Sequence, residues 1–116
     1  SKNLILLEVA CEAIGGKFKE DHYGTLGDIG IFSFDFAKTI TCGEGGLTLT
    51  NNEKYGTYIK QFIDHGHENN PNLERGHDNR VMPGFNYRIT EMQAAVISVQ
   101  LDRLKYIVPE KNSFFQ

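Results

Sequence analysis

The chain has 116 residues, 40% of them hydrophobic, and its 12 basic and 15 acidic side chains leave a formal net charge of −3. This length and composition predict one compact unit and exclude the basic surface of a dedicated nucleic-acid-binding protein. No apolar run approaches the roughly 18 residues that span a bilayer, and the amino terminus does not resemble a signal peptide. Cys11 and Cys42 lack the spacing of a zinc site or a disulfide scaffold, which predicts a reducing, cytoplasmic location.

The first part of the chain predicts a buried strand followed by a short helix. Residues 4–7 are four consecutive apolar residues, too few for a helix, which indicates a strand buried on both faces of a parallel sheet. Residues 8–14 contain good helix formers and end at Gly15 and Gly16, where glycine can close a helix. Residues 17–23 are charged and alternate weakly, as expected of an exposed strand or hairpin.

Closely spaced glycines then separate two further predicted strands, residues 29–34 and 47–50. In the first of these, Phe32 and Phe34 alternate with polar residues, one of which is Ser33. Because successive side chains of a strand point to opposite faces, we expect the phenylalanines in the core and Ser33 on the polar face.

The second half predicts two helices. Apolar residues recur at spacings of three and four over residues 55–63, after an asparagine that can cap a helix. Thr90 and Gln93 form a capping-box pattern that opens a second helix, expected to run to about Ile107 and to end near Pro109.

The residues between these helices, 64–85, are polar and show no period, which predicts a long functional or mobile loop. His65 and His67 lie there beside Asp64 and Glu68, a grouping that raises the question of a metal site. The spacing matches no zinc pattern, so we expect no metal.

Lys38 is the strongest candidate for reactive chemistry. It follows the strand that contains Ser33 and precedes a glycine-rich turn, residues 43–46. Partial burial there would lower the pKa of the lysine toward that of a neutral amine able to attack a carbonyl carbon. The alternative is that Lys38 is an ordinary solvated surface lysine.

Several motifs occur in a fixed order over nearly the whole chain. They are Gly24-Thr25-Leu26-Gly27-Asp28-Ile29-Gly30, Phe32-Ser33-Phe34, Lys38, Gly43-Glu44-Gly45-Gly46, Asp64-His65-Gly66 and residues 84–95 from Gly84 to Ala95. Together they resemble the DegT/DnrJ/StrS family of pyridoxal-phosphate (PLP)-dependent nucleotide-sugar aminotransferases. The resemblance implies an α/β fold, part of the large domain of a fold-type I PLP enzyme, with a mostly parallel sheet flanked by helices. Residues 1–116 would then form a single fragment of that domain, without its amino-terminal part and the carboxyl-terminal small domain.

The resemblance assigns roles to three residues. Lys38 would carry PLP as a Schiff base and later move a proton between the substrate carbon and the cofactor. Ser33 would hydrogen-bond the cofactor phosphate, although a small strand residue bonded to a neighbour is an equal alternative. Asn86 would reach the phosphate in the partner subunit, which implies a homodimer with shared active sites; the alternative for Asn86 is local turn chemistry.

The sequence departs from the family pattern after the first strand. The family has Glu-Asp there, and the aspartate pairs with the protonated pyridine nitrogen of the cofactor. This chain has Glu8 and Val9. Either Glu8 or another group substitutes, or the chemistry is impaired, or Val9 is a mutation or an error. Glu12 stands where the family usually has Gln or His near the ring, with a solvated residue as the alternative.

The implied activity is transfer of an amino group from an amino acid, with glutamate the expected donor, to a keto group of a nucleotide-linked sugar in polysaccharide biosynthesis. A sugar-dehydratase branch of the family replaces the lysine by histidine, so Lys38 argues against it. A catalytically impaired remnant or assembly module is the alternative outside enzymology, supported by Val9 and the short chain.

Overall fold

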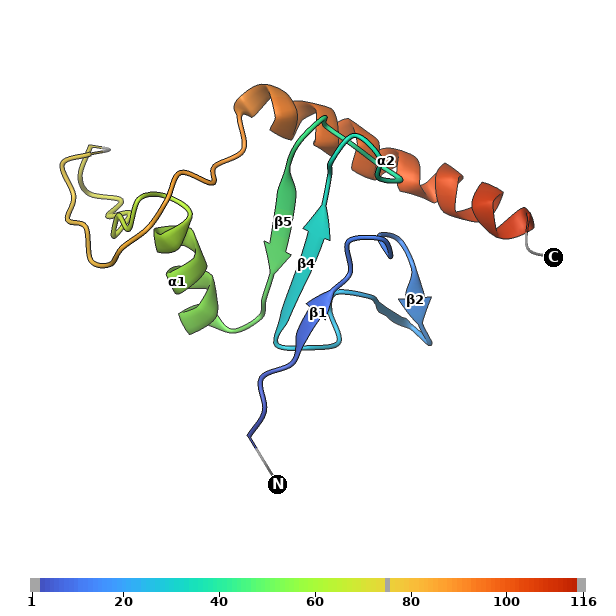
Figure 1. Cartoon of the computed structure of the whole chain (residues 1–116), viewed down its shortest axis with the longest axis horizontal. Coiled ribbons are helices and arrows are strands. Elements are labelled where there is room, and N and C mark those ends of the chain that lie inside the picture. Colours follow the sequence, from blue (N-terminus) through green and yellow to red (C-terminus); the bar gives the residue numbers. More distant parts are fainter. Residues whose placement is uncertain (1–2, 75, 115–116) are drawn as a thin grey trace. The chain divides into compact units, whose positions relative to one another are not determined.

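The computed structural model describes residues 3–74 and 76–114. The elements in chain order are β1 (Leu7–Val9), β2 (Lys17–Phe18), β3 (Asp21–His22), β4 (Ile29–Ser33), β5 (Gly46–Leu49), α1 (Glu53–Phe62) and α2 (Glu91–Ser113) (Figure 1). They form two compact units. The first contains the described residues up to Thr50 and those from Ile89 onward, and the second contains residues 51–88.

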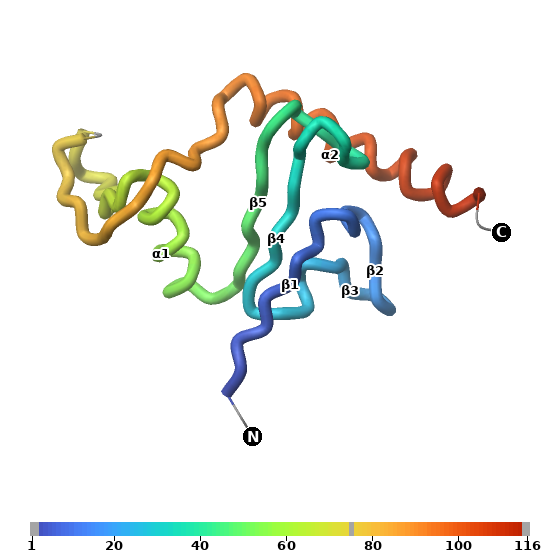
Figure 2. The backbone as a smooth tube through the Cα atoms, in the orientation of Figure 1, coloured from blue at the N-terminus to red at the C-terminus, as the bar shows by residue number. Residues whose placement is uncertain are grey.

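A three-stranded sheet organises the first unit, with the strand order β1-β4-β5 (Figure 2). β1 pairs with β4 in parallel, Leu7 opposite Ile29, whereas β4 pairs with β5 antiparallel, Ser33 opposite Gly46. The sheet is therefore mixed in the described residues, and the expected parallel arrangement holds only for β1 and β4. The α/β class itself is confirmed.

The core of this unit lies on the phenylalanine face of β4. Phe32 and Phe34 are buried together with Ala10, Ile40 and Ile97, which confirms the predicted alternation.

Gly30 has to be glycine, because a Cβ atom at this position would lie 1.9 Å from the backbone oxygen of Gly24.

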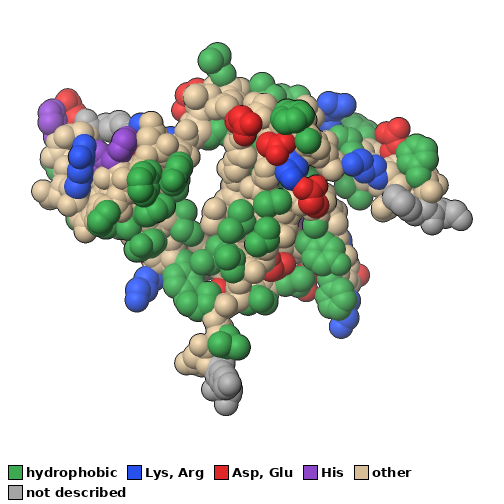
Figure 3. Space-filling view, in the orientation of Figure 1, with side chains coloured by type: hydrophobic (Ala, Val, Ile, Leu, Met, Phe, Trp, Pro, Cys, Tyr) green, Lys and Arg blue, Asp and Glu red, His purple; other side chains and the backbone are tan. Residues whose placement is uncertain are grey.

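Two expectations for the beginning of the chain are wrong. The strand starts at Leu7, and residues 4–7 are exposed, from 80% at Leu4 to 50% at Leu7, instead of buried on both faces. Residues 8 and 9 belong to β1, and residues 10–14 contain turns instead of a helix. Glu8 and Val9 pair with Gly30 and Ile31 of β4, and the N–H of Ala10 donates to the oxygen of Ile31, so the extended backbone continues to residue 10. Figure 3 shows hydrophobic side chains at the surface over the strands.

The predicted hairpin at residues 17–23 is confirmed, since β2 and β3 pair antiparallel. The chain that follows it is held by Glu8 of β1. The two carboxylate oxygens of Glu8 accept hydrogen bonds from the backbone N–H groups of Gly24 (2.8 Å) and Gly27. These contacts hold the residues before β4 against β1.

α2 begins as predicted but ends later. Thr90 and Gln93 form the complete capping box, yet the helix continues past Pro109 to Ser113. Contacts on both sides of the proline hold this part of the helix. Before it, Ile107 packs against the core, and after it, Lys111 Nζ donates a hydrogen bond to Thr39 Oγ1 at 3.0 Å. Across residues 3–74 and 76–114, neither helix is both long and apolar enough to cross a membrane.

In the second unit, α1 has the predicted asparagine cap, since Asn52 Oδ1 accepts from the N–H of Lys54 at 3.0 Å. Phe62, near its end, contacts the rings of Phe85 and Tyr87. The segment from 64 to 88, called here the 64–88 segment, has no helix or strand in its described part but contains two isolated bridges. Its chain is therefore ordered by side-chain contacts and single hydrogen bonds.

Candidate functional site

The candidate site lies at the carboxyl ends of the two parallel strands. Val9 ends β1, Ser33 ends β4, and Lys38 follows β4 after a turn in which the N–H of Lys38 donates to the oxygen of Asp35 at 3.1 Å. In open α/β sheets this edge is where ligands bind, because loops from neighbouring strands converge there. We refer to Lys38, Glu12, Val9 and Ser33 as the lysine site.

Lys38 is paired with Glu12. Its Nζ atom donates a hydrogen bond to Glu12 Oε1, and the two groups form a salt bridge. The lysine side chain is 16% exposed and the glutamate side chain 79% exposed. The bond to Glu12 is the main reason that the pKa of Lys38 is raised above its ordinary value, against the smaller effect of burial. The expected lowering of this pKa is therefore wrong, because an anion neighbours the amine.

Ser33 keeps a hydroxyl that can serve a ligand. Its Oγ accepts a long hydrogen bond, 3.4 Å, from the N–H of Asp35. A hydroxyl group has one hydrogen to donate, so it can accept from Asp35 and donate to an anionic oxygen at the same time.

Val9 offers only apolar contact at the end of β1. The residue is 73% exposed. Glu8 does not supply a carboxylate on the face to which Val9 points, because neighbouring strand residues point to opposite faces. In addition, the Glu8 carboxylate already accepts hydrogen bonds from Gly24 and Gly27. The N–H of Gly24 is the largest of the causes that lower the pKa of Glu8. Glu8 thus organises the loop before β4.

Asn86 belongs to the second unit and has local partners. Its Oδ1 accepts from Arg88 Nε at 3.0 Å, and Arg88 Nε also lies 3.3 Å from Oδ1 of the buried Asp64. Asp64 and Asn86 form one of the isolated bridges. These local contacts agree with the alternative reading of Asn86 as a turn residue.

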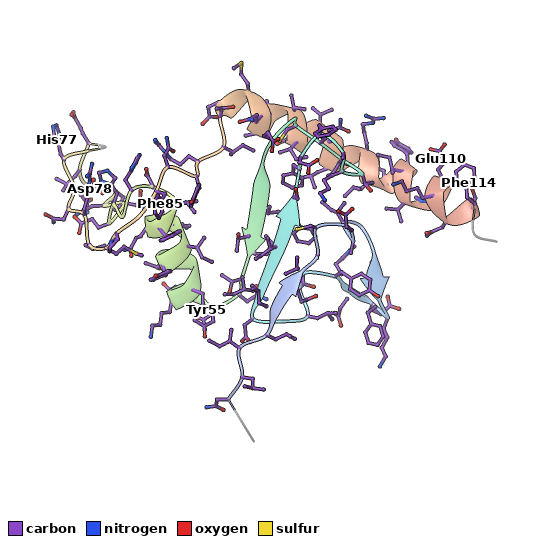
Figure 4. All side chains as sticks on the ribbon, viewed as in Figure 1. Tyr55, His77, Asp78, Phe85, Glu110 and Phe114 are labelled. Atoms are coloured by element: carbon purple, nitrogen blue, oxygen red, sulfur yellow. The ribbon has the colours of Figure 1, made fainter. Side chains whose placement is uncertain are left out.

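His67 of the 64–88 segment is bonded to a carboxylate of the same segment. His67 Nδ1 lies 2.7 Å from Asp78 Oδ1, and Asp78 Oδ2 accepts from the N–H of Asn69 at 2.8 Å. Burial raises the pKa of Asp78, but the bonds from His67 and Asn69 outweigh it, so that this pKa is lowered. No group of three His, Cys, Asp or Glu among the described residues could hold a metal ion. Figure 4 labels Asp78 on this segment.

The sequence did not reveal a second cation near the lysine site. A cavity of about 220 Å³ is lined by Glu12, Tyr23, Thr39 and Lys111, among others. Lys111 is 72 positions from Thr39, its hydrogen-bond partner. No local sequence pattern could have indicated this contact.

With this geometry in place, comparison with known proteins identifies the family. Residues 1–116 match the DegT/DnrJ/EryC1/StrS aminotransferase family. The chain belongs to this family. GDP-perosamine synthase from Escherichia coli O157:H7 is 37% identical over 111 residues, which cover 96% of this chain and 29% of that protein.

Two solved structures have the same fold. The aminotransferase from Psychrobacter cryohalolentis matches with a TM-score of 0.77 and 34% identity, over 87% of this chain and 27% of the other. The E. coli GDP-4-keto-6-deoxy-D-mannose-3-dehydratase with bound hydrated PLP matches with a TM-score of 0.80 and 30% identity, over 90% and 30% respectively. The family member described here therefore spans less than a third of the length of these relatives.

Proposed function

We propose that this chain carries the lysine-bearing part of the large domain of a PLP-dependent enzyme that transfers an amino group to a keto group of a nucleotide-linked sugar. The observation that carries the proposal is the position of Lys38 at the carboxyl ends of two parallel strands in a chain of this aminotransferase family. The relatives support the substrate class, because the name of one of them contains a GDP-linked sugar. We further propose an amino acid, glutamate, as the donor.

The lysine site fits PLP at two of its three contact points. Lys38 would supply the amine that holds the cofactor aldehyde and would then move the proton at the substrate carbon. The Ser33 hydroxyl, which accepts from Asp35, would donate to a phosphate oxygen, and the side chain of Glu12 lies beside the amine. Val9 would offer the ring only apolar contact. When bound, PLP supplies an electron-withdrawing ring that stabilises negative charge on the substrate carbon.

The test of this function is spectroscopic and chemical. Addition of PLP to the purified native protein should give a shifted visible absorbance band, and addition of glutamate with a keto sugar nucleotide should give the amino sugar nucleotide. If only the spectrum of free PLP appears, the chain belongs to the alternative class, a non-catalytic member that keeps the fold. Val9 is the observation that favours this alternative.

We also propose a homodimer in which Asn86 reaches the cofactor phosphate of the partner subunit. In support, Asn86 is exposed and keeps its side-chain NH₂ group for a further bond, while its oxygen is used by Arg88. Light scattering should give a dimer mass for the native protein, and Asn86→Ala should weaken PLP binding. A stable monomer with full PLP affinity would overturn this proposal.

A further inference from the structure

The amine of the lysine site has a carboxylate partner. Glu12 lies in the turns that follow β1, and its Oε1 binds the Nζ atom of Lys38. Val9, at the end of β1, brings no charge to the site. Glu12 therefore decides the charge state in which the amine meets a ligand.

We propose that Glu12 is a positioning residue that holds Lys38 as an oriented ammonium ion until a carbonyl compound enters the site and displaces the Glu12 carboxylate, after which the ammonium can lose its proton to water and become the neutral nucleophile. This inference rests on the proposed function and concerns the same site. A lysine amine attacks carbonyl carbon only in its neutral form, so an anion bonded to it withholds the nucleophile. Glu12 therefore makes the reactivity of Lys38 depend on what occupies the site.

The charges around Lys38 agree with this role. Glu12 is bonded to it directly, and Asp35 and Cys11 act on it through space in the same direction, favouring the ammonium. Lys111 lines the cavity beside Glu12, but its Nζ atom is engaged by Thr39. Glu12 is thus the dominant anion at Lys38.

The difference in exposure explains why the pair can open. The Glu12 side chain is mostly in solvent and lies in the turns that follow β1, whereas the Lys38 side chain is largely covered. Water can solvate the Glu12 carboxylate when it swings away, so release costs little for the anion. The amine remains in place at the edge of the sheet. The more exposed partner is therefore the one that moves.

The test measures the rate at which acetic anhydride acetylates each lysine of the native protein as a function of pH. PLP is absent, and mass spectrometry quantifies the acetylation at each lysine. The accessibility of a lysine scales its rate at every pH, whereas its protonation sets the pH of the midpoint. The midpoint of Lys38 should lie above that of Lys17, an exposed lysine of β2. In Glu12→Gln it should fall, so that acetylation of Lys38 below the midpoint rises roughly two- to fivefold, the range expected of a partly exposed ion pair.

Glu20→Gln is the matched control, because it removes the same charge from an exposed position of the same unit and should leave the Lys38 profile unchanged. Glu12→Ala is a second variant that also removes the reach of the side chain and should give the same downward shift. An unchanged midpoint in both Glu12 variants, or an equal shift in Glu20→Gln, would overturn the inference. Failure of the proposed function is seen separately, as absence of PLP attachment to Lys38 in all of these proteins.

Discussion

The lysine site and the 64–88 segment are both rich in polar side chains, but different forces hold them. Around Lys38 the chain is fixed by a sheet and by buried phenylalanines, Phe32 and Phe34. In the 64–88 segment, ring contacts to Phe62 are joined by polar fixed points, namely the buried Asp64 and the pair of His67 with Asp78. The amine of Lys38 in the first region is paired with an exposed side chain, whereas the polar groups of the second region bond to one another in covered positions.

The difference between the lysine site and the 64–88 segment indicates how a functional cluster of polar residues can be told from a structural one. Buried and mutually bonded groups such as His67 and Asp78 stabilise a loop, because an unpaired polar group in such a place would be costly. Lys38 also has a partner, but that partner is exposed and can be displaced. The availability of a group to a ligand therefore separates the two regions better than the residue types do.

The largest expected effect is on catalysis at the lysine site. Lys38→Ala removes both the attachment point and the proton carrier, so kcat should fall by about 10³-fold, within the range for loss of an acid–base group. Lys17→Ala is the control and should keep native turnover, measured as amino sugar nucleotide formed. Substantial turnover in Lys38→Ala would contradict the assignment of Lys38.

The next effect tests the backbone of the 64–88 segment. Gly66 has φ +78°, and a Cβ atom there would lie 1.7 Å from the backbone oxygen of Met82. Gly66→Ala should destabilise the second unit by about 3 kcal/mol or more, as expected when strain and a backbone clash combine. Gly76→Ala is the control, since its φ is +88° but its Cβ position is open. Hydrogen exchange should show the loss in residues 51–88 and not in β4; equal losses for the two variants would contradict this.

Val9→Asp should place a carboxylate at the proposed ring end of the lysine site. A charge-assisted hydrogen bond contributes about 1.5 to 3 kcal/mol, and the exposure of Val9 favours the lower end. Since each 1.4 kcal/mol is about tenfold in rate, turnover in the native protein should rise about tenfold. Val9→Asn is the control without charge. Unchanged turnover at equal PLP occupancy would show that another acid serves the ring or that the ring does not lie over β1.

The smallest effect is the pH dependence of stability. The pKa of Glu8 is lowered in the folded protein, so its contribution is present above its ordinary value of 4.5 and is lost as the pH falls through the lowered folded value. Glu8→Gln should therefore be less stable than the native protein at pH 7, and the difference should shrink in acid. Denaturant unfolding at several pH values measures this. A difference that is constant with pH would contradict the role of the carboxylate.

The sequence was sufficient where the signal was local. The alternation in β4 and the capping pair Thr90 and Gln93 were predicted because each lies within a few residues of its partner. The turns after β1 were not predicted, because the N–H of Ala10 binds Ile31. Likewise, the sequence named Lys38 and Glu12 separately but not their contact, which spans 26 positions.

The most direct test of the central claim is to locate the covalently bound cofactor. The native protein is incubated with PLP, reduced with borohydride and digested, and the labelled peptide is sequenced by mass spectrometry. We expect the label on Lys38, in the peptide that follows β4. A label on another lysine, with none on Lys38, would contradict it.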